Sequence, residues 1–141
     1  MNREIKFRVW NSDDNKMEHP LVFAICNDGR LKPLIKCSDG NNAYKDYPIM
    51  QSTGLKDKNG NEIYEGDILC NDEYHTWEWR GVVKFFHGVF GAEWLTNVKS
   101  QSMVGSWGQK HNLRKLDDDI LERQVIVGNI FENPELLTEP S

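Results

Sequence analysis

The sequence has few of the residues that build metal centres or disulfide frameworks. It contains three cysteines and four histidines in 141 residues, and neither type recurs at a metal-ligand spacing such as Cys-x-x-Cys or His-x-x-x-His. An odd number of cysteines also argues against a disulfide framework. We therefore expect reduced structural thiols in the cytoplasm at Cys26, Cys37 and Cys70, histidines in loops or on the surface, and no metal or cofactor.

Long apolar runs and a positive net charge are also absent. No stretch approaches the roughly 18 apolar residues of a membrane-spanning helix, and no positively charged leader opens the sequence. These absences exclude a transmembrane role and predict a cytoplasmic protein. The formal net charge of −5 and the pI of about 5.3 argue against a broad basic surface for nucleic acid, but not against a local one.

What the sequence does contain favours one compact β domain. It is 38% hydrophobic and includes five Trp, six Phe and four Tyr. A chain of this length removes roughly two thirds of its unfolded surface from water on folding. Large aromatic side chains bury much area per residue, which suits a small barrel or two packed sheets.

Strand signals dominate the N-terminal region. Alternating apolar and polar residues from Ile5 to Trp10 predict a half-buried strand, and a second strand begins near Met17. The apolar run 21–26 predicts a buried strand, followed by a hairpin turn and a return strand over 31–36. The return strand contains Pro33 and is therefore expected at a sheet edge.

The polar stretch 38–46 predicts a loop. We expect it to lie within one domain spanning residues 1–141. The alternative is an N-terminal β subdomain, residues 1–40, followed by a second subdomain, residues 47–141.

Residues 50–69 place a turn and a strand. Asn59-Gly60 is expected to supply the positive backbone angles of a tight hairpin turn. Gly66-Asp67 is expected to kink the backbone just before the apolar run 68–70. The remaining chain predicts a β-meander, a short helix, a strand and a terminal helical turn. These elements are expected at 68–71, 81–86, 89–95, 116–123, 124–131 and 133–135, with His87-Gly88 as a hairpin turn and Asn133 as a helix N-cap.

Four segments of the chain resemble the YopX family, small proteins of bacteriophages and prophages. They are Arg3 to Trp10 with Lys16-Met17, Met50 to Leu69, Gly81 to Phe85, and Val127 to Leu137. The resemblance implies a mostly β, soluble protein of phage origin. It brings no catalytic or binding residues, because the family is poorly characterised.

Two motifs imitate reactive sites. Asp57-x-Asn59-x-Asn61 resembles the start of a calcium loop, but position six holds Glu62 and position twelve holds Ile68, where glycine and a bidentate glutamate are required. We expect these side chains to bond their own backbone and shape the turn. Asp67 follows a glycine and is a candidate general base. The competing interpretation is that it anchors backbone N–H groups.

Two segments are candidates for contacting a partner. Trp77 and Trp79 alternate with Glu78 and Arg80, so an extended backbone would place both indoles on one face, either as a partner platform or as a cap on the core. Residues 95–115 have no acidic side chain and predict a flexible basic loop, either solvated or attracting phosphate. Its candidate contact residues are Lys99, Trp107, Lys110, Arg114 and Lys115.

Two function classes follow from these patterns, and an enzyme is a distant third. The first is a non-catalytic phage accessory protein that contacts a protein, itself or a host factor, through its tryptophan segments and strand edges. The second is a small-barrel protein that binds nucleic acid through Arg3, Lys6, Arg8 and the 95–115 segment. The fold is expected to be mainly β, antiparallel, with one or two short helices near the C-terminus.

Overall fold

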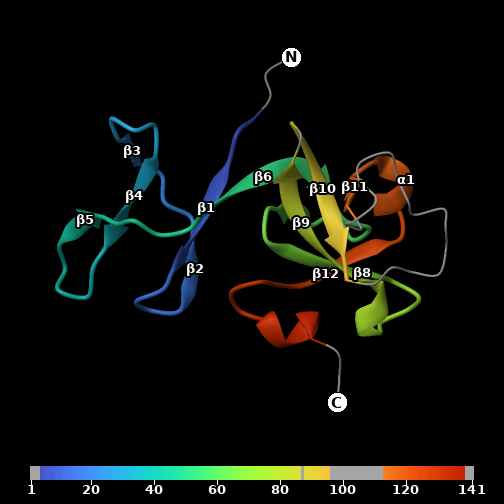
Figure 1. Ribbon diagram of the computed structural model, residues 1–141. Coiled ribbons are helices and arrows are strands. Elements are labelled where there is room, and N and C mark those ends of the chain that lie inside the picture. Colours follow the sequence, from blue (N-terminus) through green and yellow to red (C-terminus); the bar gives the residue numbers. More distant parts are fainter. Residues whose placement is uncertain (1–3, 87, 96–112, 139–141) are drawn as a thin grey trace. The chain divides into compact units, whose positions relative to one another are not determined.

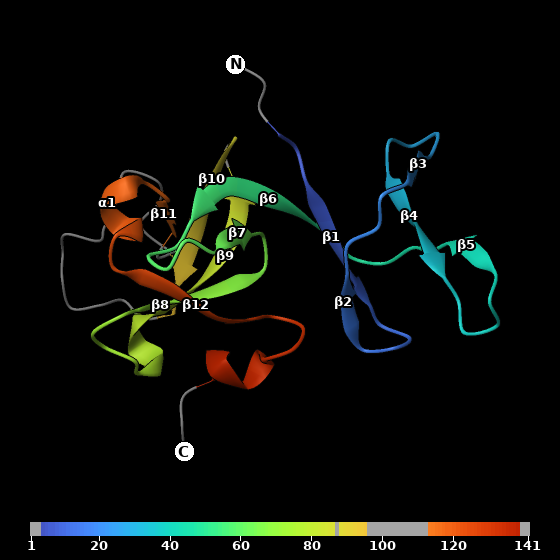
Figure 2. The ribbon, with the colours of Figure 1, turned by 180° about the vertical axis from the view of Figure 1, so that it is seen from behind.

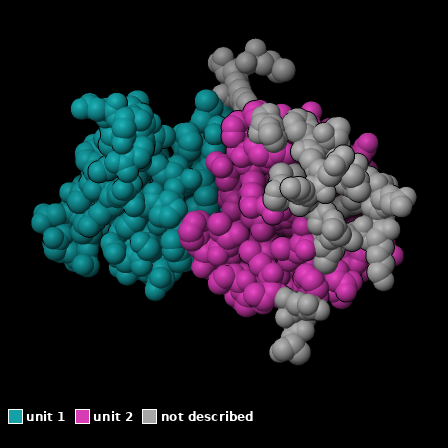
Figure 3. Space-filling model, in the orientation of Figure 1, with its two compact units in different colours: residues 1–51 teal, residues 52–141 magenta. Residues whose placement is uncertain are grey.

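The computed structural model describes residues 4–86, 88–95 and 113–138. Antiparallel strands dominate these residues and the helices are short, which confirms the mainly β prediction (Figure 1). The chain divides into two compact units, residues 1–51 and residues 52–141 (Figure 3). None of the described helices is long and apolar enough to cross a bilayer.

Unit 1 is built from five strands and the first residues of a sixth. They are β1 (Phe7–Asn11), β2 (Lys16–Glu18), β3 (Phe23–Ile25), β4 (Leu31–Lys36), β5 (Asn42–Tyr44) and the start of β6 (Ile49–Lys56). β1 pairs on one side with β2 and on the other with β6. The second sheet has the order β3-β4-β5 (Figure 2). The loop predicted over 38–46 therefore contains a strand, β5. β4 contains Pro33 and pairs with a strand on each side, so the edge position predicted for it is wrong.

Burial in β1 is more complete than its alternating sequence indicates. Arg8, Val9, Trp10 and Asn11 are all buried, so the prediction of a half-buried strand is wrong. β1 is a central strand with a paired neighbour along each of its edges, so neither edge faces solvent. The polar Asn11 side chain is tolerated in this buried position because its oxygen accepts hydrogen bonds from two backbone N–H groups of the following turn, both at 3.0 Å.

The apolar run 21–26 behaves in the opposite way. Only Phe23–Ile25 forms a strand, and Leu21 and Ile25 are 98% and 77% exposed. The prediction of a buried strand here is wrong. β3 is a three-residue edge strand, so it has a paired neighbour on one side only.

Three hairpin turns share one construction, at residues 26–30, 37–41 and 57–61. In each turn the glycine N–H donates to the carbonyl three residues earlier, and the glycine has a positive φ of 84–87°. This is a four-residue turn that ends in a left-handed glycine. In the third turn Gly60 takes the positive angle and Asn59 does not, so the expected pair of positive angles at Asn59-Gly60 is wrong for its first member.

Unit 2 contains the rest of β6 and the elements that follow it. They are β7 (Glu62–Tyr64), β8 (Asp67–Asn71), η1 (Trp77–Trp79), β9 (Arg80–Phe86), β10 (Val89–Trp94), β11 (Leu113–Lys115), α1 (Asp118–Leu121), β12 (Gln124–Asn129) and η3 (Pro134–Leu137). Five strands form one antiparallel sheet in the order β11-β10-β9-β8-β12, which confirms the predicted meander (Figure 1).

The core of unit 2 joins this sheet to β7 and to the segment around α1. Its buried members are Ile63, Leu69, Val83, Ala92, Trp94, Leu116 and Leu121. α1 falls within the predicted helix 116–123, and the Asp117 side chain caps it by accepting from the Ile120 N–H at 2.9 Å. α1 thus places Leu121 in the core and Ile120 beside it.

Asp57 connects the turn of residues 57–60 to the last strand of the sheet. Its side chain is 5% exposed. One carboxylate oxygen accepts from the backbone N–H groups of Asn59 and Asn61 at 3.0 and 2.8 Å, and the other accepts from the Ile126 N–H at 3.0 Å. The turn is therefore shaped by its own polar side chain, as predicted, and β12 is attached to it across 69 residues of sequence.

The C-terminal segment forms the expected helical turn by a different contact. η3 begins at Pro134, but the Asn133 side chain makes no cap hydrogen bond to it. The side-chain oxygen of Asn133 instead accepts from the backbone N–H of Asn129 at 3.3 Å. Asn133 thus occupies the predicted N-cap position without making the side-chain cap. Asn129 itself is buried and closes the same bend by accepting from the backbone N–H groups of Phe131 and Glu132.

Candidate functional site

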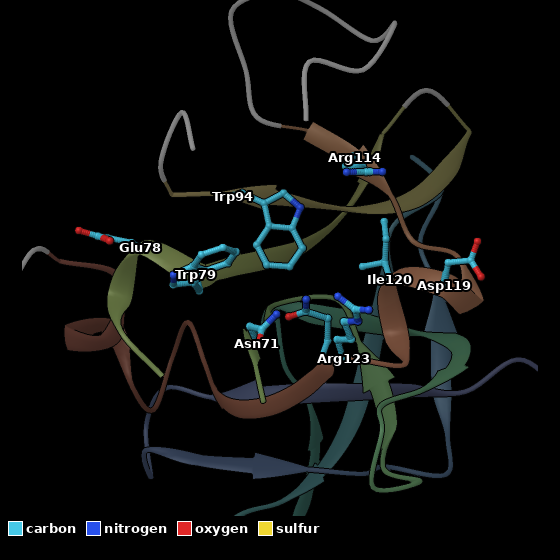
Figure 4. A pocket seen from close by; sticks show the side chains of 9 residues that line it. Asn71, Glu78, Trp79, Trp94, Arg114, Asp119, Ile120 and Arg123 are labelled. Atoms are coloured by element: carbon cyan, nitrogen blue, oxygen red, sulfur yellow. The ribbon is translucent and has the colours of Figure 1, made fainter. Parts of the chain in front are cut away.

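Unit 2 contains a pocket of about 220 Å³ (Figure 4). Side chains of η1, β10 and β11 line it together with side chains of α1 and the start of β12. The lining residues are Asn71, Glu78, Trp79, Trp94, Arg114, Asp119, Ile120, Arg123 and Gln124. This volume is smaller than the roughly 300–1,000 Å³ of sites for drug-sized ligands, so the pocket has room for one ring system or one side chain.

Trp79 is held in place by the loop that precedes it. Its indole stacks on the ring of Tyr74, with centroids 4.8 Å apart and an interplanar angle of 21°. The Asn71 side chain shapes this loop by accepting from the Glu73 and Tyr74 N–H groups at 2.8 and 3.2 Å. One face of the Trp79 indole is thus covered by Tyr74, and the residue still lines the pocket.

Trp77 and Trp79 do not form the shared face that an extended backbone would give them. Residues Trp77–Trp79 are a 3₁₀ helix, in which successive side chains point in different directions. Trp79 lines the pocket and Trp77 does not. The two-indole platform predicted for an extended segment is therefore wrong, and a single tryptophan of this segment reaches the candidate site.

Trp94 reaches the pocket because a glycine lies opposite it in the sheet. Trp94 pairs with Gly81 across β10 and β9, and a Cβ atom on Gly81 would lie 2.6 Å from Cε3 of the indole. The indole therefore lies directly over the Gly81 backbone. Trp94 is 6% exposed, and this close packing fixes its orientation.

Charged side chains surround the pocket asymmetrically. Figure 4 shows the guanidinium groups of Arg114 and Arg123 on two sides of the pocket, whereas the carboxylates of Glu78 and Asp119 point away from its centre. This arrangement favours ligands that carry a negative group beside a flat apolar part.

Two buried polar atoms of pocket-lining residues have no hydrogen-bond partner among the residues that the structure describes. They are the indole nitrogen Nε1 of Trp94 and the amide oxygen Oε1 of Gln124. The Gln124 side chain is 8% exposed. Most buried polar atoms in folded proteins are paired, so unpaired ones at a pocket indicate where a ligand or water would bind.

The structure brings together only part of the predicted contact set. Trp79 and Arg114 line the pocket, and Lys115 lies exposed beside Arg114 on β11. Arg80 does not line the pocket, because its guanidinium donates to the carbonyls of Leu136 and His75 at 2.9 and 3.3 Å. Lys99, Trp107 and Lys110 lie outside the described residues.

The structure changes the predictions for the basic loop 95–115 and for the N-terminal cations. Residues Leu113–Lys115 form a strand rather than a loop. Arg8 is buried at 9% exposure, so it does not present the open basic surface that the nucleic-acid hypothesis assigned to it. Lys6 pairs with Glu4 at 3.5 Å, and Arg3 lies outside the described residues.

Seven of the nine lining residues lie outside the predicted contact set, among them Trp94, Ile120, Arg123 and Gln124. The sequence places these four in an ordinary strand, a short helix and the start of the next strand, and no spacing connects Trp94 to Gln124. The one usable signal was Gly81 opposite a large aromatic residue, and it requires the strand register to be known.

In the two motifs that imitate reactive sites, the aspartate carboxylates accept hydrogen bonds from backbone N–H groups. Both carboxylate oxygens of Asp57 accept from backbone N–H groups, which leaves the calcium-like motif as a turn. Asp67 is 2% exposed and accepts from the Tyr64 N–H at 2.8 Å, as the anchoring interpretation predicted. Within residues 4–86, 88–95 and 113–138, no group of three or more His, Cys, Asp and Glu side chains is arranged to hold a metal ion.

Cys70 yields a prediction about thiol reactivity. Burial raises the pKa of its thiol, although the Arg80 guanidinium acts in the opposite direction. A raised thiol pKa means less thiolate at a given pH, and the thiolate is the reactive form. At pH 8 a disulfide reagent should therefore modify half-buried Cys26 and Cys37 first and Cys70 at least about tenfold more slowly.

Mass spectrometry of peptides after timed quenching measures the three rates separately. In urea the three cysteines should react at similar rates, because unfolding removes the burial. Equal rates in the folded protein would contradict the buried position of Cys70.

Comparison with known proteins places the chain in a family. The sequence model of the family described as "YopX protein" matches residues 6–138. Protein EF1440 from Enterococcus faecalis has a similar crystal structure, with 30% identity, a TM-score of 0.63, and coverage of 97% of this chain and 100% of that one. No curated protein gives a significant match.

A second crystal structure, protein yopX from Bacillus subtilis, is 18% identical to this chain. The comparison covers 96% of this chain and 98% of that one, with a TM-score of 0.57. At this identity the likeness concerns the fold. The family match over nearly the whole described chain agrees with the resemblance read from the four sequence segments, and we conclude that the chain belongs to the YopX protein family.

Proposed function

We propose that this protein is a non-catalytic phage or prophage accessory module that works in the bacterial cytoplasm by binding a protein, either a second copy of itself or a host factor. The observation that carries the proposal is the apolar surface of unit 1. Among the described residues eight large hydrophobic side chains are exposed, and five belong to this smaller unit. These five are Ile5, Leu21, Val22, Ile25 and Tyr44.

The strand edges of unit 1 add to this surface. β3 and β5 are the edges of a three-stranded sheet, and an edge strand presents unpaired backbone N–H and C=O groups to which another chain can add a strand. Exposed apolar side chains beside open strand edges are typical of protein-binding surfaces. The non-catalytic part of the proposal is supported by the use of Asp57 and Asp67 as backbone anchors.

Changing Leu21 and Ile25 together to serine should abolish the association. Both side chains are largely exposed, so the double variant should keep its unfolding free energy within about 0.5 kcal/mol of the parent per substitution. Light scattering after gel filtration, from about 1 to 100 μM, measures self-association across the concentrations at which weak interfaces form. Affinity capture from phage-carrying cells, with and without nuclease, measures host partners.

The matched control is Val127→Ser, which alters an exposed apolar side chain of unit 2. It should leave association unchanged. The proposal fails if the parent protein stays monomeric over the whole range and captures no protein from the cells. A protein partner lost on nuclease treatment would indicate that nucleic acid mediates the contact.

A further inference from the structure

The unpaired atoms of Trp94 and Gln124 define the polar chemistry that a ligand of the unit 2 pocket must carry. The indole Nε1 is a donor only, and the amide Oε1 is an acceptor. Both are buried, and within residues 4–86, 88–95 and 113–138 neither has a partner. A ligand that satisfies both must therefore present an acceptor to Trp94 and a donor to Gln124.

The walls of the pocket select a flat group. Trp79 and Trp94 contribute indole rings, and Ile120 adds an aliphatic side chain (Figure 4). Tyr74 fixes the Trp79 ring by stacking, and the Gly81 backbone fixes the Trp94 ring. Two aromatic walls with fixed orientations suit a planar ring of one or two cycles, because such a ring gains contact area on its faces without loss of much conformational freedom.

The cations add a third requirement. The Arg123 side chain is exposed and lines the pocket, and Arg114 lies on another side of it (Figure 4). Lys115 follows Arg114 on β11. These residues match a ligand whose planar ring is attached to an anionic group that extends out of the pocket, because guanidinium groups bind phosphate oxygens strongly.

We propose that the unit 2 pocket binds a nucleobase, carried by a free nucleotide or by a single-stranded nucleic acid, with the edge of the base on Trp94 and Gln124 and its phosphate near Arg123. The Watson–Crick edge of each base carries both a donor and an acceptor, the faces of the base stack on aromatic rings, and the attached phosphate is anionic. A protein side chain meets these requirements less well. Phe has no polar edge, Trp has a donor only, Tyr and His carry no attached anionic group, and Asn and Gln lack a ring.

Nuclear magnetic resonance on the full chain tests the proposal directly. The five tryptophans give separate indole N–H signals in a ¹⁵N-labelled sample, and Trp94→Phe identifies the Trp94 signal by its loss. Titration uses the four ribonucleoside monophosphates, uridine as an uncharged nucleoside, ten-residue single strands of each base, and N-methylacetamide as a peptide-group probe. We expect the Trp94 signal to move downfield and saturate, because its N–H gains an acceptor.

The ligand that saturates the Trp94 signal shows whether the base is carried by a free nucleotide or by a single-stranded nucleic acid. Saturation by a monophosphate at millimolar concentration or below identifies a nucleotide site, and saturation by single strands alone identifies a nucleic-acid site. The proposal is overturned if N-methylacetamide moves the Trp94 signal and nucleotides do not. It is equally overturned if no ligand moves the signal.

Gln124→Leu separates ligand binding from folding. The substitution removes an unpaired buried oxygen and keeps an aliphatic side chain of similar size, so the melting temperature should stay the same or rise. Affinity for the active nucleotide should fall by at least about tenfold, which corresponds to the loss of one buried hydrogen bond. A variant that loses both stability and binding would show a structural role instead and contradict the assignment.

Arg123→Gln tests the phosphate contact. The exposed side chain is dispensable for folding, so stability should not change. The variant should weaken monophosphate binding by about threefold to tenfold and leave uridine binding unchanged, because only the phosphate meets the guanidinium. Equal losses for nucleotide and nucleoside would rule out the proposed orientation of the base.

Discussion

Replacing Asp57 by alanine is expected to lower the free energy of unfolding of unit 2 by about 4 kcal/mol. Three backbone N–H groups lose a charged acceptor, and hydrogen bonds to charged groups contribute roughly 1.5–3 kcal/mol each. The full sum is not expected, because Asn59 and Asn61 lie in an exposed turn where water replaces part of the loss. Urea unfolding followed by tryptophan fluorescence measures the change.

Two control variants separate the roles of Asp57. Asp57→Asn keeps one acceptor oxygen for the turn, but its amide nitrogen would face the Ile126 N–H, so we expect about half of the alanine effect. Asp39→Ala removes a comparable turn contact to Asn41 at an exposed position in unit 1, and it should cost about 0.5–1 kcal/mol. An effect of Asp57→Ala no larger than that of Asp39→Ala would contradict the link between the turn and β12.

Gly81→Ala is expected to displace the Trp94 indole and lower the free energy of unfolding by about 2–3 kcal/mol. The added methyl would lie 2.6 to 3.0 Å from three atoms of the indole, and overpacking of this kind typically costs 1–3 kcal/mol. The Trp94 indole N–H signal should shift without ligand. The nucleotide affinity that we propose for the pocket should be lost, because one of the pocket walls has moved.

Gly54→Ala is the matched control for this substitution. Gly54 has a φ of +77°, and nothing lies within 4 Å of an added Cβ atom. Backbone strain alone should therefore cost about 1–2 kcal/mol and leave the Trp94 signal in place. The double variant Gly81→Ala/Trp94→Leu should be less destabilised than the sum of its single changes, since the smaller side chain leaves room for the methyl. Strict additivity would show that the two residues do not interfere.

Sequence patterns predicted the secondary structure correctly where one short segment contains all the residues that determine it. The hairpins near Gly29 and Gly60, the meander from β8 to β10 and the helix at α1 depend on turn residues, alternation and a capping aspartate a few positions away. The role of Asp57 in its own turn was predictable for the same reason. Its second role, as acceptor for Ile126, was not, because that residue is 69 positions away in the sequence.

Burial was the property that sequence patterns predicted least well. The run 21–26 is apolar and exposed at Leu21 and Ile25, while β1 alternates in polarity and is buried at Arg8 and Asn11. A strand is buried when other elements pair with it and cover its faces, and these elements come from elsewhere in the chain. The error at Trp77 and Trp79 has a related cause, since three residues contain too little periodicity to distinguish a strand from a 3₁₀ helix.

The amino-acid sequence alone was sufficient to establish the mainly β class, most of the strands and the membership of the YopX family. These properties follow from short-range backbone preferences and from contiguous segments of the sequence that resemble the family. Only the folded chain could place Trp94 over Gly81 and bring it to one pocket with Gln124. That arrangement depends on strand register and on long-range packing, in which small differences of free energy among many contacts decide which side chains meet.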